Sequence, residues 1–185
     1  MPDRLQSLEQ IRDKVMAQLT AATLDREHPW RTPVLATING QAADARCVVI
    51  REFDDRDCRF LIYTDERAGK VTQALRNPVG TLVMWSPVLG WQLRCRVHLS
   101  LEVSGLAASS RWARIKLSPA AQDYLSPLPP GTELEAPGAP THAAVPRDYF
   151  SIINAQVLSI DWLELHALGH RRARFEGAQG TWLQP

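Results

Sequence analysis

The residues of this chain best suited to hold an anion are basic side chains at the ends of apolar segments. Lys70 is one of only three lysines, and it follows Tyr63 and Thr64, where an apolar run ends and a helix-like pattern begins. Its ammonium group is a compact positive charge, and the first turn of a helix adds backbone donors and a favourable dipole. Arg46, Lys70 and the Thr64 hydroxyl therefore form a candidate phosphate cradle. The alternative is a solvated helix start, because charge at such a position is usually only surface.

Two apolar runs carry polar residues that can face a ligand. Arg46 and Arg51 stand five positions apart in "RCVVIR". On one strand they would point to opposite faces, so at least one of them would meet something buried or bound. The segment 91–103 alternates apolar and polar residues without exception, which is typical of a half-buried antiparallel strand. Its polar face either meets water or, through Gln92 and Arg94, lines a groove.

Other chemistries find little support. His166 and His170 have the spacing of zinc ligands on a helix, but no third ligand is nearby, so no metal site is predicted. The three cysteines never form a C-x-x-C pair, which argues against a disulfide framework and favours a reducing compartment. Neither G-x-S-x-G nor G-x-G-x-x-G nor a P-loop pattern occurs. These absences argue against a serine hydrolase and a doubly wound dinucleotide fold.

Composition limits the size and the partners of the protein. A chain of 185 residues with 45% hydrophobic residues predicts a single domain over 1–185. The 21 basic and 20 acidic residues leave a net charge of +1, so no nucleic-acid partner is expected. No apolar run approaches the length of about 18 residues that a membrane span needs. We therefore expect a soluble, cytoplasmic protein with no membrane partner.

Hydrophobic periodicity predicts a β-rich middle between helical flanks. An amphipathic helix is expected over 4–20, a short helix over 69–77 that ends before Pro78, and one or two helices in 107–125 split at Ser118-Pro119. Residues 126–146 form a Pro/Gly-rich loop, interpreted as a lid or as disorder. The predicted strands are 34–38, 46–53, 59–63, 79–85, 91–103 and 157–165, and 147–153 is expected to be helical. This pattern predicts an α+β domain built on an antiparallel sheet or small barrel.

Four segments together resemble one known family. "ARCVVIREFD", "FLIYTDERAGK", "NPVGTLVMWSPVLGWQLRCRV" and "HRRARF" resemble, in this order and at similar spacings, the pyridoxamine 5'-phosphate oxidase family. The resemblance covers roughly residues 32–103 and the tail. It implies an antiparallel split β-barrel with flanking helices, which binds FMN.

The resemblance also implies roles for individual residues. Lys70 corresponds to the lysine that reaches the FMN phosphate, while Gln92 and the backbone of 46–49 would tune the flavin ring. No dedicated acid or base is required, since the flavin itself accepts hydride or electrons. Arg51, His170 and Arg172 would face an anionic substrate. The implied FMN-binding residues are Arg46, Val48, Val49, Tyr63, Thr64, Arg67, Lys70, Gln92 and Arg174.

The departures from the family pattern concern the substrate and one phosphate contact. The family's vitamin B6 oxidases usually place an arginine directly before the lysine, where this chain has Gly69, and Arg67 is the candidate to compensate. The trio that holds a substrate phosphate in those oxidases does not align with 109–124. The tail reads His170-Arg171-Arg172 where those oxidases have an arginine, an apolar residue and a histidine. Flavin binding is thus better supported than oxidation of pyridoxine phosphate.

Three functions follow from the resemblance. The first is an FMN-dependent oxidoreductase acting on an unidentified small polar or anionic substrate. The second is a non-catalytic carrier or sensor that binds flavin or haem, and the third is a deazaflavin-dependent reductase. We also expect a homodimer with FMN at its interface, for which helix 4–20 and the six tryptophans would supply apolar surface.

Overall fold

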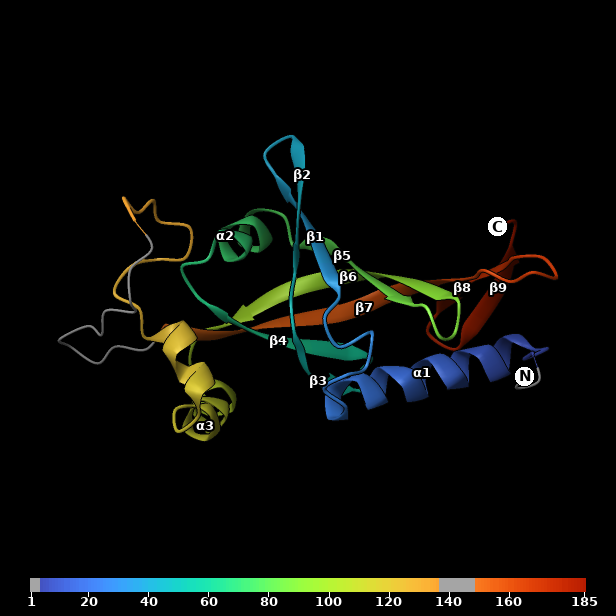
Figure 1. The fold of residues 1–185 in the computed structure, drawn as a ribbon, viewed down its shortest axis with the longest axis horizontal. Coiled ribbons are helices and arrows are strands. Elements are labelled where there is room, and N and C mark those ends of the chain that lie inside the picture. The colour runs from blue at the N-terminus through green and yellow to red at the C-terminus, as the bar shows by residue number, and fades with distance from the viewer. Residues whose placement is uncertain (1–3, 137–148) are drawn as a thin grey trace.

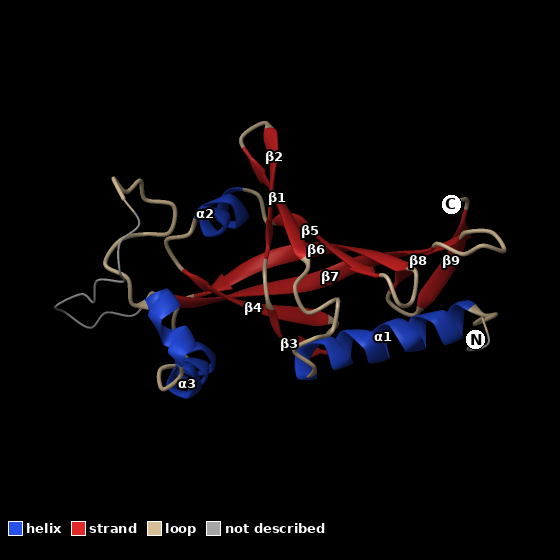
Figure 2. Ribbon diagram, viewed as in Figure 1, coloured by secondary structure: helices blue, strands red, loops and turns tan. Residues whose placement is uncertain are grey.

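The structure, a computed structural model, describes residues 4–136 and 149–185. An antiparallel sheet of nine strands occupies the centre of the described part, and helices lie around it (Figure 1, Figure 2). Seven strands follow the order β2-β1-β5-β6-β7-β4-β3, while β8 pairs with β7 and β9 pairs with β8. The elements are α1 (Leu8–Leu24), β1 (Val34–Asn39), β2 (Ala42–Cys47), β3 (Ile50–Asp54), β4 (Arg59–Asp65), α2 (Gly69–Arg76), β5 (Val79–Ser86), β6 (Trp91–Glu102), α3 (Leu106–Ile115), a 3-10 helix η1 (Pro119–Tyr124), β7 (Phe150–Glu164), β8 (Arg171–Glu176) and β9 (Gln179–Leu183).

Strand β6 confirms the predicted half-buried strand. Leu93 and Cys95 are fully buried, whereas Arg94 and Arg96 between them are exposed. The turn before β6 requires Gly90, because its φ is +64° and an added Cβ would lie 2.7 Å from the carbonyl oxygen of Leu165. The alternation therefore separates a core face from a polar face along the central strands.

The predicted single strand 46–53 is wrong, because the chain bends between β2 and β3. The Val48 amide donates to the Pro33 carbonyl at 3.0 Å, and the Ile50 amide donates to the Arg31 carbonyl at 2.9 Å. Strands β2 and β3 lie at the two ends of the strand order, so this crossing joins the two edges of the sheet. The inference that Arg46 and Arg51 face opposite sides of one strand fails for the same reason.

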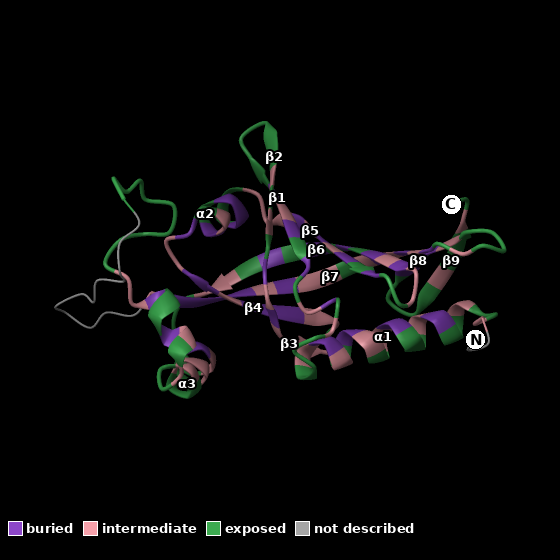
Figure 3. Cartoon of the chain, in the orientation of Figure 1, coloured by how far each residue is buried: buried purple, intermediate pink, exposed green. Residues whose placement is uncertain are grey.

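Helix α1 starts and ends later than predicted and buries its apolar stripe. Ser7 and Gln10 form a capping box, so the helix begins at Leu8 rather than at residue 4. Ile11, Val15 and Leu19 are at most 1% exposed, and Figure 3 shows this buried stripe along α1. The expectation that the stripe supplies surface for a second subunit is therefore wrong, because it packs into the core of its own chain.

The segment predicted as helix 147–153 is also wrong where the structure describes it. Phe150 to Ile153 open strand β7 and pair with β4, in the register Tyr63 to Ile152 and Asp65 to Phe150. Long-range pairing overrides the local pattern here. The tail forms the β8–β9 hairpin, for which no element was predicted.

Several other expectations are settled. The helix break at Ser118-Pro119 is confirmed, because α3 ends at Ile115 and η1 begins at Pro119. Of the predicted loop 126–146, residues 137–146 lie outside the described residues. Within the described ranges, no helix combines the length and the hydropathy needed to cross a membrane.

Candidate functional site

A cavity of about 390 Å³ lies beside β4 and the N-terminus of α2, and we call it the β4–α2 pocket. It brings together residues from the bend after β2, from β3, β4 and α2, and from η1. Half of the predicted site residues line it, namely Val48, Val49, Arg51, Tyr63, Thr64 and Lys70. Asp123, Tyr124 and Pro130 also line it, and the sequence analysis missed them.

Lys70 is a half-buried cation in this pocket. Its side chain has no hydrogen bond and no ion pair with any of the described residues. Burial lowers the pKa of Lys70 below its usual value, and the positive charge of Arg46 lowers it further, while Asp65 acts in the opposite direction. A desolvated ammonium group is stabilised by a bound anion. Partial burial and a lowered pKa are the properties expected of an anion ligand, and that role of Lys70 stays a prediction.

The surroundings of Lys70 add donors for the same anion. Ala68, the residue that caps α2, has no side-chain hydrogen bond to the first turn. The first N–H groups of a helix have no partner within the regular helical pattern, although that of Val71 already donates to the Ala68 carbonyl at 2.8 Å. Thr64 is 3% exposed, and its hydroxyl donates only a long hydrogen bond of 3.3 Å to the Asp65 carbonyl. The donor set therefore fits a phosphate group.

We expect the apoprotein to gain, or at least not lose, stability when Lys70 is replaced by Met. The lowered pKa means that the unfolded chain binds more protons than the folded chain in the alkaline range between the lowered pKa and 10.5. Wild-type stability should therefore rise with pH through that range, and the Lys70→Met variant should lack this rise. Urea unfolding of the apoprotein at neutral and alkaline pH measures both effects. A loss of more than about 1 kcal/mol at neutral pH would show that Lys70 serves the fold.

Arg46 is largely occupied by contacts within the protein. Its Nη1 donates to the Leu35 carbonyl at 3.2 Å and to Thr37 Oγ1 at 2.5 Å. Its Nη2 donates to Gln73 Oε1 at 2.8 Å and pairs with Asp44 at 2.6 Å. Gln73 belongs to α2, so Arg46 joins the β1–β2 hairpin to the helix that carries Lys70. A direct contact of Arg46 with a phosphate stays a prediction.

Arg67, the predicted compensating contact, does not line the β4–α2 pocket. Its guanidinium pairs with Asp65 at 2.7 Å and donates to backbone carbonyls of Ser126, Pro127 and Leu128. These partners leave it little capacity for another anion. Its assignment as a phosphate ligand also stays a prediction.

A network behind the pocket fixes Tyr63. The Tyr63 hydroxyl donates to Glu52 Oε1 at 2.6 Å, and Arg111 of α3 donates to both carboxylate oxygens of Glu52, at 2.8 and 2.7 Å. Arg111 lowers the pKa of Glu52, while burial and Glu52 raise the pKa of Tyr63. The Tyr63 phenol therefore stays protonated. Sequence offers no signal for this network, because 59 positions separate Glu52 from Arg111.

Arg51 lies beside the aromatic side of the pocket. Its guanidinium carbon is 5.9 Å from the centre of the Tyr63 ring. The Arg51 charge also acts on Tyr124, where it partly offsets the rise in pKa that burial causes. Arg51 forms no ion pair with a carboxylate among the described residues. It is a second cation in the pocket, beside two aromatic rings.

The remaining predicted residues form a second group at the other end of β7. Gln92 is opposite Leu163, and Leu163 is opposite Arg172, so these residues form one row across β6, β7 and β8. None of Gln92, His170, Arg172 and Arg174 lines the β4–α2 pocket. Tyr63 is opposite Ile152, and Gln92 is opposite Leu163, eleven positions further along β7. At about 3.3 Å per residue, the two groups are roughly 35 Å apart. Within one chain, the predicted site is in two halves.

The arginines of this second group mostly contact carboxylates on the same face of the sheet. Arg172 donates to both carboxylate oxygens of Asp161, at 3.0 and 2.7 Å, and Arg94 donates to Asp161 at 2.6 Å. Arg174 pairs with Glu176 at 3.3 Å. The exposed His170 accepts a hydrogen bond from the His166 amide through Nδ1. The described residues contain no group of three His, Cys, Asp or Glu side chains that could hold a metal ion.

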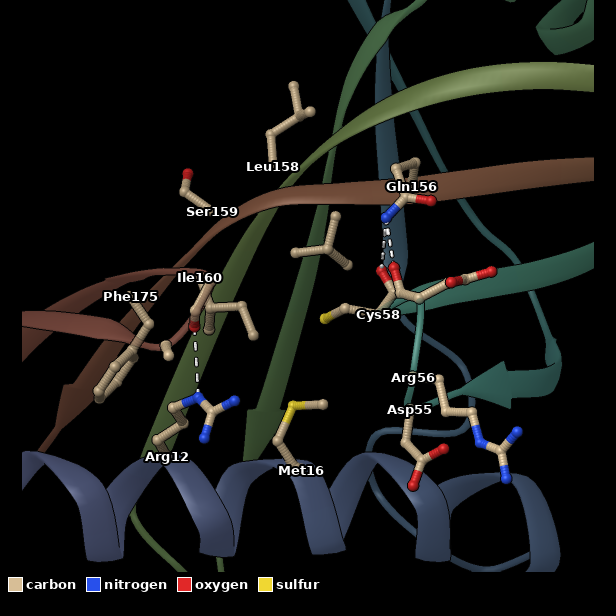
Figure 4. A pocket seen from close by; sticks show the side chains of 14 residues that line it. Arg12, Met16, Asp55, Arg56, Cys58, Gln156, Leu158, Ser159, Ile160 and Phe175 are labelled. Carbon is tan, nitrogen blue, oxygen red and sulfur yellow. Dashed lines mark hydrogen bonds between the residues drawn. The ribbon is translucent and has the colours of Figure 1, made fainter.

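Another cavity, of about 330 Å³, lies between α1 and the sheet (Figure 4). It is lined by residues such as Arg12, Met16, Cys58 and Gln156, and by none of the predicted site residues. Burial raises the pKa of the Cys58 thiol, so this cysteine is not activated as a nucleophile. The β4–α2 pocket thus remains the candidate site.

Comparison with known proteins identifies the part of the chain that supplies most of the pocket lining. Residues 11–101 match the family model described as pyridoxamine 5'-phosphate oxidase, FMN-binding domain. FMN is thus the cofactor of the matched domain. A comparison with curated proteins finds no match.

Solved structures share the fold over 80% to 99% of the chain. A pyridoxamine 5'-phosphate oxidase-related, FMN-binding protein from Nostoc punctiforme has 21% sequence identity and a TM-score of 0.69, covering 97% of this chain and 100% of its own. PhzG from Burkholderia lata, solved in complex with tetrahydrophenazine-1-carboxylic acid, has 17% identity and a TM-score of 0.75, covering 99% and 98%. The General Stress Protein 26 from Bacillus anthracis has 14% identity and a TM-score of 0.51, covering 80% and 92%. At these identities the likeness shows the fold, and it confirms the predicted α+β antiparallel split barrel.

Proposed function

Because residues 11–101 belong to the pyridoxamine 5'-phosphate oxidase family of FMN-binding domains, we propose that this chain is an FMN-dependent oxidoreductase. The proposed substrate is a small polar or anionic molecule. The observation that carries the proposal is Lys70, a half-buried cation without an anionic partner among the described residues, in a pocket with five other predicted residues. Such a cation at a helix N-terminus is suited to a phosphate group.

The residues of the pocket have separate tasks in this proposal. Lys70, Thr64 and the first turn of α2 hold the phosphate of FMN, and the bend at Val48 and Val49 offers backbone groups to the ring. FMN supplies the acceptor for hydride or electrons, so the protein binds and orients the substrate. Arg51, beside the aromatic rings of Tyr63 and Tyr124, attracts the negative charge of the substrate.

An anionic substrate has support besides the charge of Arg51. PhzG, which shares the fold, was solved with a ligand that carries a carboxylic acid. In this chain, Arg51 lacks a carboxylate partner within the described ranges, so its charge is available to a ligand. The substrate phosphate site of the vitamin B6 oxidases has no counterpart that aligns, which favours a carboxylate over a phosphate.

We further propose a homodimer in which each site takes one half from each subunit. Gln92, Arg172 and Arg174 are too far from the β4–α2 pocket to act there within one chain. They share a sheet face with apolar side chains that are not fully covered: Val34 is 37% exposed and Trp85 is 44% exposed. The register forms two neighbouring rows of side chains on this face. One row is Trp85, Gln92, Leu163 and Arg172, and the next is Val83, Arg94, Asp161 and Arg174. A mixed apolar and charged face of this kind suits a subunit interface.

The proposed location is the cytoplasm. Cys47, Cys58 and Cys95 are all free thiols. Free thiols persist in reducing compartments.

Flavin binding and turnover test the proposal together. We expect the purified protein to be yellow, or to take up added FMN with quenching of flavin fluorescence. Reduction of the bound FMN by candidate amines or carboxylic acids, followed by reoxidation with oxygen, would separate an enzyme from a flavin carrier. Uptake of haem or of a deazaflavin in place of FMN would support one of the alternative functions. A colourless protein that binds no FMN would overturn the proposal.

A further inference from the structure

Arg67 has an extensive set of contacts, although it lies outside the pocket lining. Its partner Asp65 has a side chain that is 3% exposed. The Asp65 carboxylate accepts the Arg67 backbone N–H at 2.7 Å, Nε at 3.0 Å and Nη2 at 2.7 Å. A two-pronged pair of this kind fixes the plane of the guanidinium group as well as its position.

The rest of the guanidinium group holds the chain that follows η1. Nη2 donates to the Ser126 carbonyl at 2.9 Å and to the Leu128 carbonyl at 3.4 Å, and Nη1 donates to the Pro127 carbonyl at 3.3 Å. Prolines at 127, 129 and 130 remove backbone donors, so this segment cannot form a strand or helix. Arg67 supplies the donors that regular structure would otherwise provide to these carbonyls.

The returning chain meets the same arginine. The Tyr149 ring lies under the Arg67 guanidinium, with 3.3 Å between Cζ and the ring centre. The Tyr149 backbone is fixed on both sides, because its N–H donates to the Tyr124 carbonyl at 3.0 Å and its carbonyl accepts the Glu66 N–H at 2.8 Å. Arg67 therefore stands where the chain leaves η1 and where it returns to β7.

This position matters for the pocket. Asp123 and Tyr124, just before the held carbonyls, line the β4–α2 pocket, and so does Pro130, just after them. The contacts of Arg67 with Ser126 to Leu128 therefore hold the segment that joins these lining residues, which forms one wall of the pocket. We call residues 123–130 the pocket wall.

We propose that Arg67 is a positioning residue that holds the pocket wall in place and thereby sets the space open to the substrate. It is not a ligand of the cofactor phosphate. The statement about the substrate rests on the proposed function, whereas the structural role of Arg67 does not. The Arg67 contacts depend on the forked shape of a guanidinium group, which a lysine lacks.

Hydrogen exchange of the wall tests the structural role directly. In Arg67→Met and Arg67→Lys, we expect amides in peptides covering 125–132 to exchange about tenfold faster or more, because the wall loses its charged hydrogen bonds. Arg76→Met, which removes an exposed arginine at the end of α2, is the matched control and should leave exchange unchanged. Unchanged exchange at 125–132 in both Arg67 variants would overturn the proposal. If Arg67→Met does not fold, as judged by circular dichroism, Arg67→Lys decides.

Binding of FMN and riboflavin separates a wall residue from a phosphate ligand. A wall residue affects both ligands alike, so the ratio of their affinities should stay within about twofold of wild type in both variants. A phosphate ligand would lose FMN affinity alone, by about tenfold or more in Arg67→Met, and Arg67→Lys would retain much of it because the charge remains. That result would overturn the proposal. If the wild type binds neither ligand, the proposed function fails, and the exchange measurement still decides the role of Arg67.

Discussion

Replacing Lys70 by Met is expected to lower the affinity for FMN by roughly 10- to 150-fold. The substitution keeps the length of the side chain and removes one charge-assisted hydrogen bond to the phosphate, worth roughly 1.5 to 3 kcal/mol. Since about 1.4 kcal/mol is a factor of ten, the affinity changes in that range. Riboflavin lacks the phosphate, so it should bind the wild type and the variant almost equally.

Titration of both flavins into both proteins, followed by flavin fluorescence, measures this contrast. Lys14→Met is a matched control, because Lys14 is exposed on α1, outside the lining of the β4–α2 pocket. A loss of affinity for both flavins would indicate damage to the fold. An unchanged FMN affinity in Lys70→Met would return this residue to the class of solvated helix starts.

The pH dependence of binding supplies a second measure of the same contact. A bound phosphate dianion favours the charged form of Lys70, so binding raises a pKa that burial had lowered. FMN binding then takes up a proton in the alkaline range, and wild-type affinity should fall as pH rises through the lowered pKa. The Lys70→Met variant should lack this fall, and riboflavin should lack it in both proteins.

The elements that the sequence predicted well are those whose pattern is local. Strand β6 follows from its unbroken alternation, and α2 follows from its position between Thr64 and the helix-breaking Pro78. Both depend on residues within one segment. The start of α1 at Leu8 was also readable, since Ser7 and Gln10 have capping-box spacing, but the apolar residue Leu5 drew the prediction too far toward the N-terminus.

The errors occurred where the sheet imposes its own geometry. The run from Arg46 to Phe53 looks like one strand, yet it must cross from one edge of the sheet to the other, so it bends at Val48 and Val49. The start of β7 was taken for a helix because its pairing with β4 joins residues almost 90 positions apart. No local pattern encodes either fact.

The candidate site shows the same division. The prediction that Lys70 and Thr64 lie together rested on their place around the start of a helix, and both residues line the β4–α2 pocket. The contacts of Arg46 and Arg67 could not be foreseen, because Gln73 and Ser126 reach them only through the tertiary fold. An arginine at a position that matches the family pattern can therefore be engaged by side chains and carbonyls of its own chain. Its role can be inferred only from the structure.

The second large effect is expected in mixed dimers. If each site takes its pocket from one subunit and the Gln92 and Arg174 group from the other, two differently defective subunits can rebuild an intact site. We pair Lys70→Met, which damages the pocket, with a Gln92→Ala/Arg174→Met double variant, which damages the second group. Arg174 is suitable because its side chain is 51% exposed and pairs only with Glu176 among the described residues.

Each homodimer should bind FMN at least about tenfold more weakly than wild type, from the loss of at least one charged contact per site. The mixed dimer should contain one site with all the defects and one wild-type site. Purification through two different affinity tags should therefore yield a dimer with half the wild-type number of tight FMN sites. Differently tagged subunits that both carry Lys70→Met are the control and should yield none.

Two results would contradict the shared site. A mixed dimer without any tight FMN site would mean that each chain builds its site alone, despite the roughly 35 Å that separates the two groups along β7. Sedimentation of the wild type as a monomer at micromolar concentration, with FMN still tightly bound, would exclude the dimer itself. Recovery of one tight site would assign Gln92 and Arg174 to the partner's pocket, because no arrangement within a single chain can restore binding from two damaged subunits.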